Sequence, residues 1–186
     1  MELSDDEYRG MLEELNDEQA DIVQFVKKWC EETLRVKLAG DQQAQVKPFY
    51  QFLSGSGGVG KSHVIKAVYQ TVKKILKPIH TDEPDAPTVL LVAPTGVSAF
   101  NIGNMTIHAT YLLGTRQNYQ SLSSEKQNAL YNRLHCLHLV IIDEVSMVGS
   151  DTLFDIYRRL KEIMGRSEFD ESIFGNVSIL AVGDLY

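Results

Sequence analysis

Eight consecutive residues have the types and the spacing of a phosphate-binding loop, G-x-x-x-x-G-K-[ST]. The glycines of such a loop let the backbone curl until successive N–H groups point at phosphate oxygens, which a Cβ would obstruct. Lys61 would add a cation for the β- and γ-phosphates, and Ser62 a hydroxyl ligand for Mg²⁺. The pattern predicts a nucleoside triphosphate site, the alternative being a Gly/Ser-rich turn that matches by chance. Its residues are Gly55, Ser56, Gly57, Gly58, Val59, Gly60, Lys61 and Ser62.

Two carboxylates, Asp143 and Glu144, follow an apolar run at residues 139–142. An enzyme with a phosphate-binding loop needs one carboxylate for Mg²⁺ and a second to polarise the attacking water. We assign Asp143 to the metal and Glu144 to the water, so that these two residues and Lys61 form the predicted catalytic group. The alternative is that the acidic pair caps the helix that follows.

Two more apolar runs end in polar residues. Thr95 and Gly96 follow residues 89–93, and Asp184 follows residues 177–182. Because ligands gather at the carboxyl ends of parallel strands, Thr95 is a candidate for binding a phosphate of a bound polymer, with the backbone at Gly96 close to it. Asp184 is a candidate for sensing the metal or the γ-phosphate through a water. The alternatives are an ordinary turn into a helix at Thr95 and a helix cap at Asp184.

The elements that must position these residues alternate between strands and helices. The last three expected strands are unbroken apolar runs, and the first is aromatic and apolar like a buried strand, which is typical of a parallel sheet covered by helices on both faces. The fold class is therefore expected to be α/β, a three-layer, doubly wound and mostly parallel sheet. Strands are expected at residues 49–53, 89–93, 139–142 and 177–182, and helices at 16–34, from the phosphate-binding loop to 78, and ending near 134.

Length and composition favour one domain, because 186 residues with 44% hydrophobic content can bury one good core but not two. Within residues 1–186 we interpret residues 1–14 as an acidic N-terminal tail and residues 110–137 as an insertion. Two cysteines exclude a disulfide framework, and the sequence has neither a signal-peptide pattern nor an apolar stretch long enough to span a bilayer. We expect a soluble, intracellular protein with no membrane partner.

The net charge of -7 does not exclude nucleic acid, because the acidity is uneven. Residues 1–32 carry 11 acidic and 3 basic side chains, whereas the remaining 154 residues carry 14 acidic and 15 basic ones. A nearly neutral body can still carry a local basic groove. Arg158, Arg159 and Lys161 form a basic run that is a candidate for DNA contact, the alternative being a solvated helix face.

His135, Cys136 and His138 bring soft metal ligands close together in the sequence. Their spacing straddles the expected end of a helix and the start of a strand, and no second cluster in the sequence completes a tetrahedral site. Packing or surface positions are therefore the favoured interpretation of these residues.

Four segments together resemble the petite-integration-frequency (PIF) helicases, a superfamily 1 group related to RecD. The order and spacing of the segments match this family from about residue 15 to residue 184. The resemblance implies a RecA-like domain that binds ATP and Mg²⁺. It also implies that Gln19 reads the adenine edge, the alternative being a solvated glutamine at the start of a helix. The segments are GSGGVGKS at 55–62, APTGVSAFNIGNMTIH at 93–108, IDEVSMV at 142–148 and GD at 183–184.

The same resemblance implies a motor that moves from 5′ toward 3′ along single-stranded DNA and serves DNA repair, recombination and telomere maintenance. In a eukaryote its compartment would be the nucleus or the mitochondrion. Residues 110–137 lie where these helicases place a small strand-separating insertion. The residues expected along the DNA side are Thr95, Gly96, Thr106 and His108.

The chain departs from the PIF pattern at its end, because Tyr186 comes before the later motifs and before a second domain that would supply an arginine to the transition state. We therefore expect an N-terminal motor domain that binds Mg-ATP without fast hydrolysis or unwinding. Two other classes stay open: a non-helicase phosphate-loop enzyme, such as a transposition ATPase or a nucleotide kinase, and a catalytically inactive helicase remnant that binds nucleotide or a partner.

Overall fold

Five parallel strands form one sheet in the computed structural model, which describes residues 3–40, 46–80, 83, 86–101, 105–114, 119–165 and 171–184. The strand order is β1-β5-β4-β2-β3, and every pair of neighbours is parallel. The four strands expected from the sequence are present within one residue of their predicted ends, and β3 is a short addition at one edge. The strands are β1 Tyr50–Ser54, β2 Val89–Ala93, β3 Met105–Thr106, β4 Leu139–Ile142 and β5 Ser178–Gly183.

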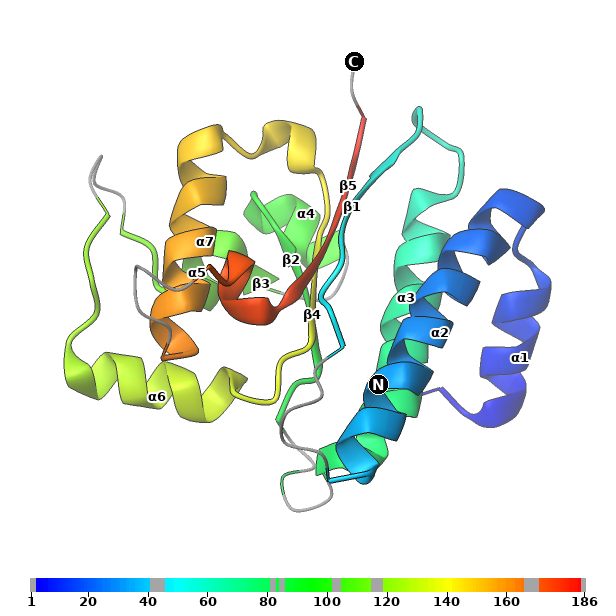
Figure 1. The fold of residues 1–186 in the computed structure, drawn as a ribbon. Coiled ribbons are helices and arrows are strands. Elements are labelled where there is room, and N and C mark those ends of the chain that lie inside the picture. The colour runs from blue at the N-terminus through cyan, green and yellow to red at the C-terminus, as the bar shows by residue number, and fades with distance from the viewer. Residues whose placement is uncertain are drawn as a thin grey trace.

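Helices cover both faces of this sheet, with α1, α2 and α3 on one side and α5, α6 and α7 on the other (Figure 1). Strand β4 shows why both faces are buried: Leu139 and Ile141 belong to the core beneath α2 and α3, whereas Val140 and Ile142 belong to the core beneath α6 and α7. The three-layer α/β class is therefore confirmed. The helices are α1 Asp5–Glu13, α2 Asp17–Leu38, α3 Lys61–Leu76, α4 Gly96–Asn101, α5 Ile107–Tyr111, α6 Ser124–Leu134 and α7 Ser150–Ile163, with 3-10 turns at η1 Lys77–His80, η2 Val145–Met147 and η3 Ile173–Asn176.

Strand β1 is the exception to the expected burial. Within the described part of the chain it pairs only with β5, so it forms an edge of the sheet. Phe49 packs into the core, but Tyr50 is 40% and Phe52 is 44% exposed. The interpretation of this run as a fully buried strand is wrong, because aromatic content alone does not distinguish a central strand from an edge strand.

The acidic segment at the N-terminus contains a helix rather than only a tail. Ser4 caps α1 in a capping box with Glu7, a Ser-x-x-Glu pattern that the sequence reasoning overlooked. The helix is held against α3, where the Tyr8 hydroxyl hydrogen-bonds to Thr71 at 2.8 Å and Lys74 pairs with Asp5 at 2.8 Å.

The predicted insertion at 110–137 contains α6 and only the last two residues of α5, and it packs against α7. Its anchor is Arg159, only 2% exposed, which donates to the carbonyls of Tyr111 and Gln120 and to the carboxylate of Glu162. Lys161 is also buried, at 6% exposure. For Arg159 and Lys161, both interpretations of the basic run, DNA contact and solvated face, are wrong.

Among the residues that the structure describes, no helix is long and apolar enough to cross a membrane.

Candidate active site

The predicted site residues lie together at one end of the sheet, where three adjacent strands have their carboxyl ends. The phosphate-binding loop connects β1 to α3, Asp184 follows β5, and Asp143 follows β4. Because β5 lies between β1 and β4, Asp184 stands between the loop and the acidic pair. This end is where parallel α/β sheets bind their ligands.

The loop has a backbone that only glycine adopts without strain at two positions. Gly58 has φ +82° and Gly60 has φ +85°, both in the left-handed region. Gly55 is needed for another reason, since a Cβ there would lie 2.8 Å from Cγ2 of Val59. Helix α3 begins at Lys61, so its positive N-terminal end faces the loop. The local geometry is that of an anion-binding cradle.

Lys61 has its ammonium group surrounded by oxygen atoms. It forms an ion pair with Asp184 and donates to the carbonyl oxygens of Gly55 at 2.6 Å and Ser56 at 3.0 Å. Three acceptors match the three N–H donors of an ammonium group. The Lys61 side chain is only 18% exposed, so these contacts are partly shielded from water. A phosphate in the loop would have to compete with Asp184 for the same cation.

Asp143 and Glu144 differ in environment although they are neighbours. Burial raises the pKa of the half-buried Asp143, while a hydrogen bond from the Glu144 N–H and the charge of Lys61 oppose that rise. Asp143 is thus within electrostatic reach of Lys61. A group whose ionised form gains from a nearby cation suits a metal ligand.

Glu144 is exposed and has φ +53°, a left-handed conformation that is unfavourable for a residue with a Cβ. Its side chain makes no capping hydrogen bond to η2, so the helix-cap alternative has no support at this residue. Strained backbone of this kind is often found at functional sites.

Gln19 contacts the phosphate-binding loop from α2. Its Nε2 donates to the Val59 carbonyl at 3.0 Å, and its Oε1 accepts from the N–H of Asn16, the residue that caps α2, at 3.1 Å. A Cβ at Gly60 would lie 2.6 Å from this Nε2. Gln19 is therefore not simply a solvated glutamine at the start of α2, because its side chain connects that helix to the loop.

The residues expected along DNA gather at the ends of β2 and β3, where Ala93 pairs with Thr106. The Thr95 hydroxyl accepts from the Ser98 N–H at 3.2 Å, and the Thr106 hydroxyl accepts from the Ala109 N–H at 3.3 Å. Both threonines thus cap short helices, which is the alternative given for Thr95, a turn into a helix. Gly96 and His108 are exposed.

Exposed apolar side chains lie beside these residues, and the sequence reasoning assigned them no role. Val97 is 73% and Phe100 is 83% exposed on α4, and Met105 is 42% exposed on β3. The signal that could have found them is the spacing of three between Val97 and Phe100, which places both on one face of a helix that follows a strand end.

Comparisons with known proteins found similar sequences and structures for most of the chain. Residues 14–186 match a family model described as PIF1-like helicase. The chain is 33% identical over 143 residues to the ATP-dependent DNA helicase Pif1 of Campylobacter jejuni, an alignment that covers 73% of this chain and 28% of that relative. The alignment with the ATP-dependent DNA helicase PIF1 of Candida albicans covers 14% of that relative's length. The chain thus spans less than a third of the length of these two curated relatives.

Two solved structures carry ligands that bear on the site. A Bacteroides Pif1 in complex with ADP-AlF4 is 25% identical with a TM-score of 0.56, over 92% of this chain and 32% of that one. A Pif1 helicase from Bacteroides in complex with ADP-AlF3 and single-stranded DNA is 25% identical with a TM-score of 0.50, over 83% of this chain and 32% of that one.

Proposed function

We propose, because this chain belongs to the PIF1-like helicase family, that it forms the ATP-binding motor domain of a DNA helicase that moves from 5′ toward 3′ along single-stranded DNA. The observation that carries the proposal is the arrangement at one end of the sheet, where Lys61 contacts Asp184 and lies within electrostatic reach of Asp143. Hydrolysis of a nucleoside triphosphate needs a cation on the phosphates and carboxylates for metal and water in that arrangement.

Mg²⁺ fits the residues at this end of the sheet. It prefers oxygen ligands, which Ser62 in the first turn of α3 and Asp143 after β4 would provide. One oxygen of Asp143 accepts from the Glu144 N–H at 2.9 Å, which orients the carboxylate and leaves its second oxygen for the metal. The ion would neutralise charge on the phosphates during transfer.

In this mechanism Lys61 exchanges partners. Its ammonium group moves from Asp184 to the β- and γ-phosphates, and Asp184 is then free to respond to the γ-phosphate. Glu144 accepts a hydrogen bond from the attacking water and aligns it. Gln19 holds the loop through Val59 and, in our proposal, also reads the adenine edge.

The DNA would run past the ends of β2 and β3. Gly96 and His108 are exposed there, and the 83% exposed ring of Phe100 offers a face on which a base can stack. Strand β2 also contacts the nucleotide side, because the Asp143 N–H donates to the Val92 carbonyl at 2.9 Å. A shift at Asp143 would therefore reach α4 through β2.

We assign these 186 residues the role of one half of the motor, in a protein that serves DNA repair, recombination and telomere maintenance, in the nucleus or the mitochondrion if eukaryotic. The support for a role as one part of a motor is that the alignments cover only 28% and 14% of two relatives named as ATP-dependent DNA helicases. Fast hydrolysis needs an arginine that stabilises the transition state, and we propose that a second domain supplies it, so these 186 residues alone would bind Mg-ATP and hydrolyse it slowly.

The test is steady-state ATP hydrolysis with Mg²⁺, with and without single-stranded DNA, beside direct binding of a fluorescent ATP analogue. Lys61→Ala removes the phosphate cation, and Lys66→Ala, an exposed lysine of the same helix, is the matched control. Binding that only Lys61→Ala abolishes supports the proposal. Equal binding by both variants would overturn the assignment of the loop, and DNA-independent turnover would favour a phosphate-loop enzyme of another class.

A further inference from the structure

A second cluster of polar side chains lies at the opposite end of the strands, where β2 and β4 begin. Glu83 precedes β2, and His135 and Cys136 connect α6 to β4. His135 Nε2 lies 3.1 Å from Glu83 Oε2 and 3.3 Å from Cys136 Sγ. The three atoms all lie within 4.8 Å of one another, close enough for one ion to touch all three.

The imidazole of His135 is oriented for this role by α6. Its Nδ1 lies 3.3 Å from the Tyr131 carbonyl and 3.2 Å from the Asn132 carbonyl. A carbonyl oxygen can only accept a hydrogen bond, so Nδ1 carries the proton. Nε2 faces Glu83 and Cys136, so it is the nitrogen that would bind an ion placed between these residues. Metal-binding histidines are commonly fixed in this way by a carbonyl on the other nitrogen.

Cys136 is buried, at 3% exposure, and its Sγ lies 3.3 Å from Nε2 of His135. A divalent cation between Cys136 and Glu83 would attract both a thiolate and a carboxylate, two anions that would otherwise repel each other.

We propose that Glu83, His135 and Cys136 bind a divalent transition-metal ion of the Zn²⁺ class, with a fourth position open to water. Sulfur, imidazole nitrogen and carboxylate oxygen are the ligands that Zn²⁺ takes in proteins, whereas Mg²⁺ and Ca²⁺ favour oxygen alone. The sequence suggested only the ligands near His135. The third ligand, Glu83, is supplied by the fold.

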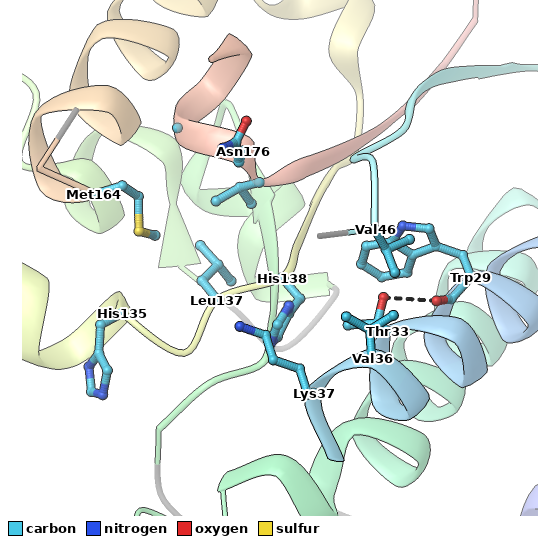
Figure 2. A pocket seen from close by; sticks show the side chains of 12 residues that line it. Trp29, Thr33, Val36, Lys37, Val46, His135, Leu137, His138, Met164 and Asn176 are labelled. Atoms are coloured by element: carbon cyan, nitrogen blue, oxygen red, sulfur yellow. Dashed lines mark hydrogen bonds between the residues drawn. The ribbon is translucent and has the colours of Figure 1, made fainter. Parts of the chain in front are cut away.

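Such an ion would connect Glu83 to the turn between α6 and β4. Figure 2 shows His135 among the residues of a neighbouring pocket, with Trp29, Thr33 and Lys37 of α2 across from it. The phosphate-binding loop follows the carboxyl end of β1, whereas this cluster lies where β2 and β4 begin, so metal binding here would not need nucleotide.

The test is titration of the chain with Co²⁺ under a thiol-free reductant, read by absorption, because thiolate bound to Co²⁺ gives a charge-transfer band in the near ultraviolet. The variant Cys136→Ser removes the proposed sulfur ligand. Cys30→Ser is the matched control, since Cys30 is the other buried free cysteine and lies in α2. Competition with a coloured chelator then measures Zn²⁺ affinity for the parent chain, His135→Ala and Glu83→Gln.

We expect the band in the parent chain and in Cys30→Ser and its loss in Cys136→Ser. Zn²⁺ affinity should fall by more than about tenfold in His135→Ala and in Glu83→Gln. Zn²⁺ should raise Tm of the parent chain but not of His135→Ala, each compared with itself without metal, which keeps the test valid if a variant is less stable. Absence of the band from the parent chain, its persistence in Cys136→Ser, or unchanged affinity in Glu83→Gln would overturn the three-ligand site.

Discussion

Lys61 and Asp184 form an ion pair that joins the phosphate-binding loop to the end of β5. The ammonium group of Lys61, which we propose binds phosphate, is thus held by a carboxylate that follows a strand far away in sequence. The pair is partly exposed, with 18% of the Lys61 side chain and 38% of the Asp184 side chain accessible. In the proposed mechanism nucleotide binding breaks this contact, so Asp184 would compete with the nucleotide whose γ-phosphate we propose it senses.

Asp184→Asn should therefore tighten the binding of ATP while slowing any hydrolysis. A partly exposed ion pair contributes about 1 kcal/mol or less, which corresponds to at most about fivefold in Kd. Fluorescence titration with an ATP analogue measures the change, and Asp151→Asn, an exposed aspartate in the first turn of α7, is the control. Weaker binding by Asp184→Asn would mean that the carboxylate helps to hold the ligand instead of competing with it.

Gln19→Ala should weaken nucleotide binding, because it removes the hydrogen bond to Val59 that holds the loop. Loss of one such bond costs about 1 kcal/mol, or roughly fivefold in affinity. Comparison of ATP with GTP separates two roles: equal losses indicate loop positioning only, and a larger loss for ATP indicates adenine recognition. Gln24→Ala, an exposed glutamine of the same helix, should change neither.

Gly60→Ala should destabilise the chain by about 1–2 kcal/mol, because the alanine would have to adopt the left-handed region at φ +85°. Its Cβ would also lie 2.6 Å from Gln19 Nε2 and displace that side chain. Gly57→Ala is a control within the same loop, since a Cβ there meets no atom within 4 Å. Urea unfolding of both variants gives the comparison. Equal stability of the two would contradict the described loop conformation.

Glu144→Gln should leave ATP binding intact and lower turnover by about 100-fold or more, because an amide cannot accept the proton of the attacking water. Glu144→Gly should lower turnover equally but raise Tm, since glycine relieves the strain at φ +53°. Single-turnover hydrolysis and thermal unfolding measure the two effects. If Glu144→Gln hydrolysed ATP at the parent rate, another group would have to orient the water.

Phe100→Ala should weaken binding of single-stranded DNA without loss of stability, because the ring is 83% exposed. A base stacked on an aromatic ring contributes about 1–3 kcal/mol, so Kd should rise by roughly tenfold. Anisotropy with a labelled oligonucleotide is the measurement. Phe154→Ala serves as the control, since Phe154 is 56% exposed on α7. An unchanged Kd would place the DNA path elsewhere.

Local patterns in the chain were enough to predict four of the five described strands and the glycine-rich loop after β1. Runs such as residues 139–142 are apolar at every position because both faces of β4 are covered, and this cause leaves its mark in the sequence itself. The turn of the loop can be predicted from its glycines for a similar reason, since the left-handed φ at Gly58 and Gly60 favours that residue type. The family resemblance rests on the same short segments.

Other features depend on which segments the fold places side by side. The exposure of Phe52 follows from the edge position of β1, and the burial of Arg159 follows from the carbonyls of Tyr111 and Gln120 that surround it. Neither residue type predicts those environments.

By itself, then, the sequence determined the α/β class, the glycine positions of the loop and the place of Asp143 and Glu144 after a buried strand, because each depends on residues that are neighbours in the chain. Only the tertiary structure decided three contacts: the ion pair between Asp184 and Lys61, the hydrogen bond from Gln19 to the Val59 carbonyl, and the contact between Glu83 and His135. The physical reason is that hydrogen bonds and ion pairs act only over a few ångströms. They can form between distant segments only after the order of the strands and the packing of the helices have placed those segments side by side.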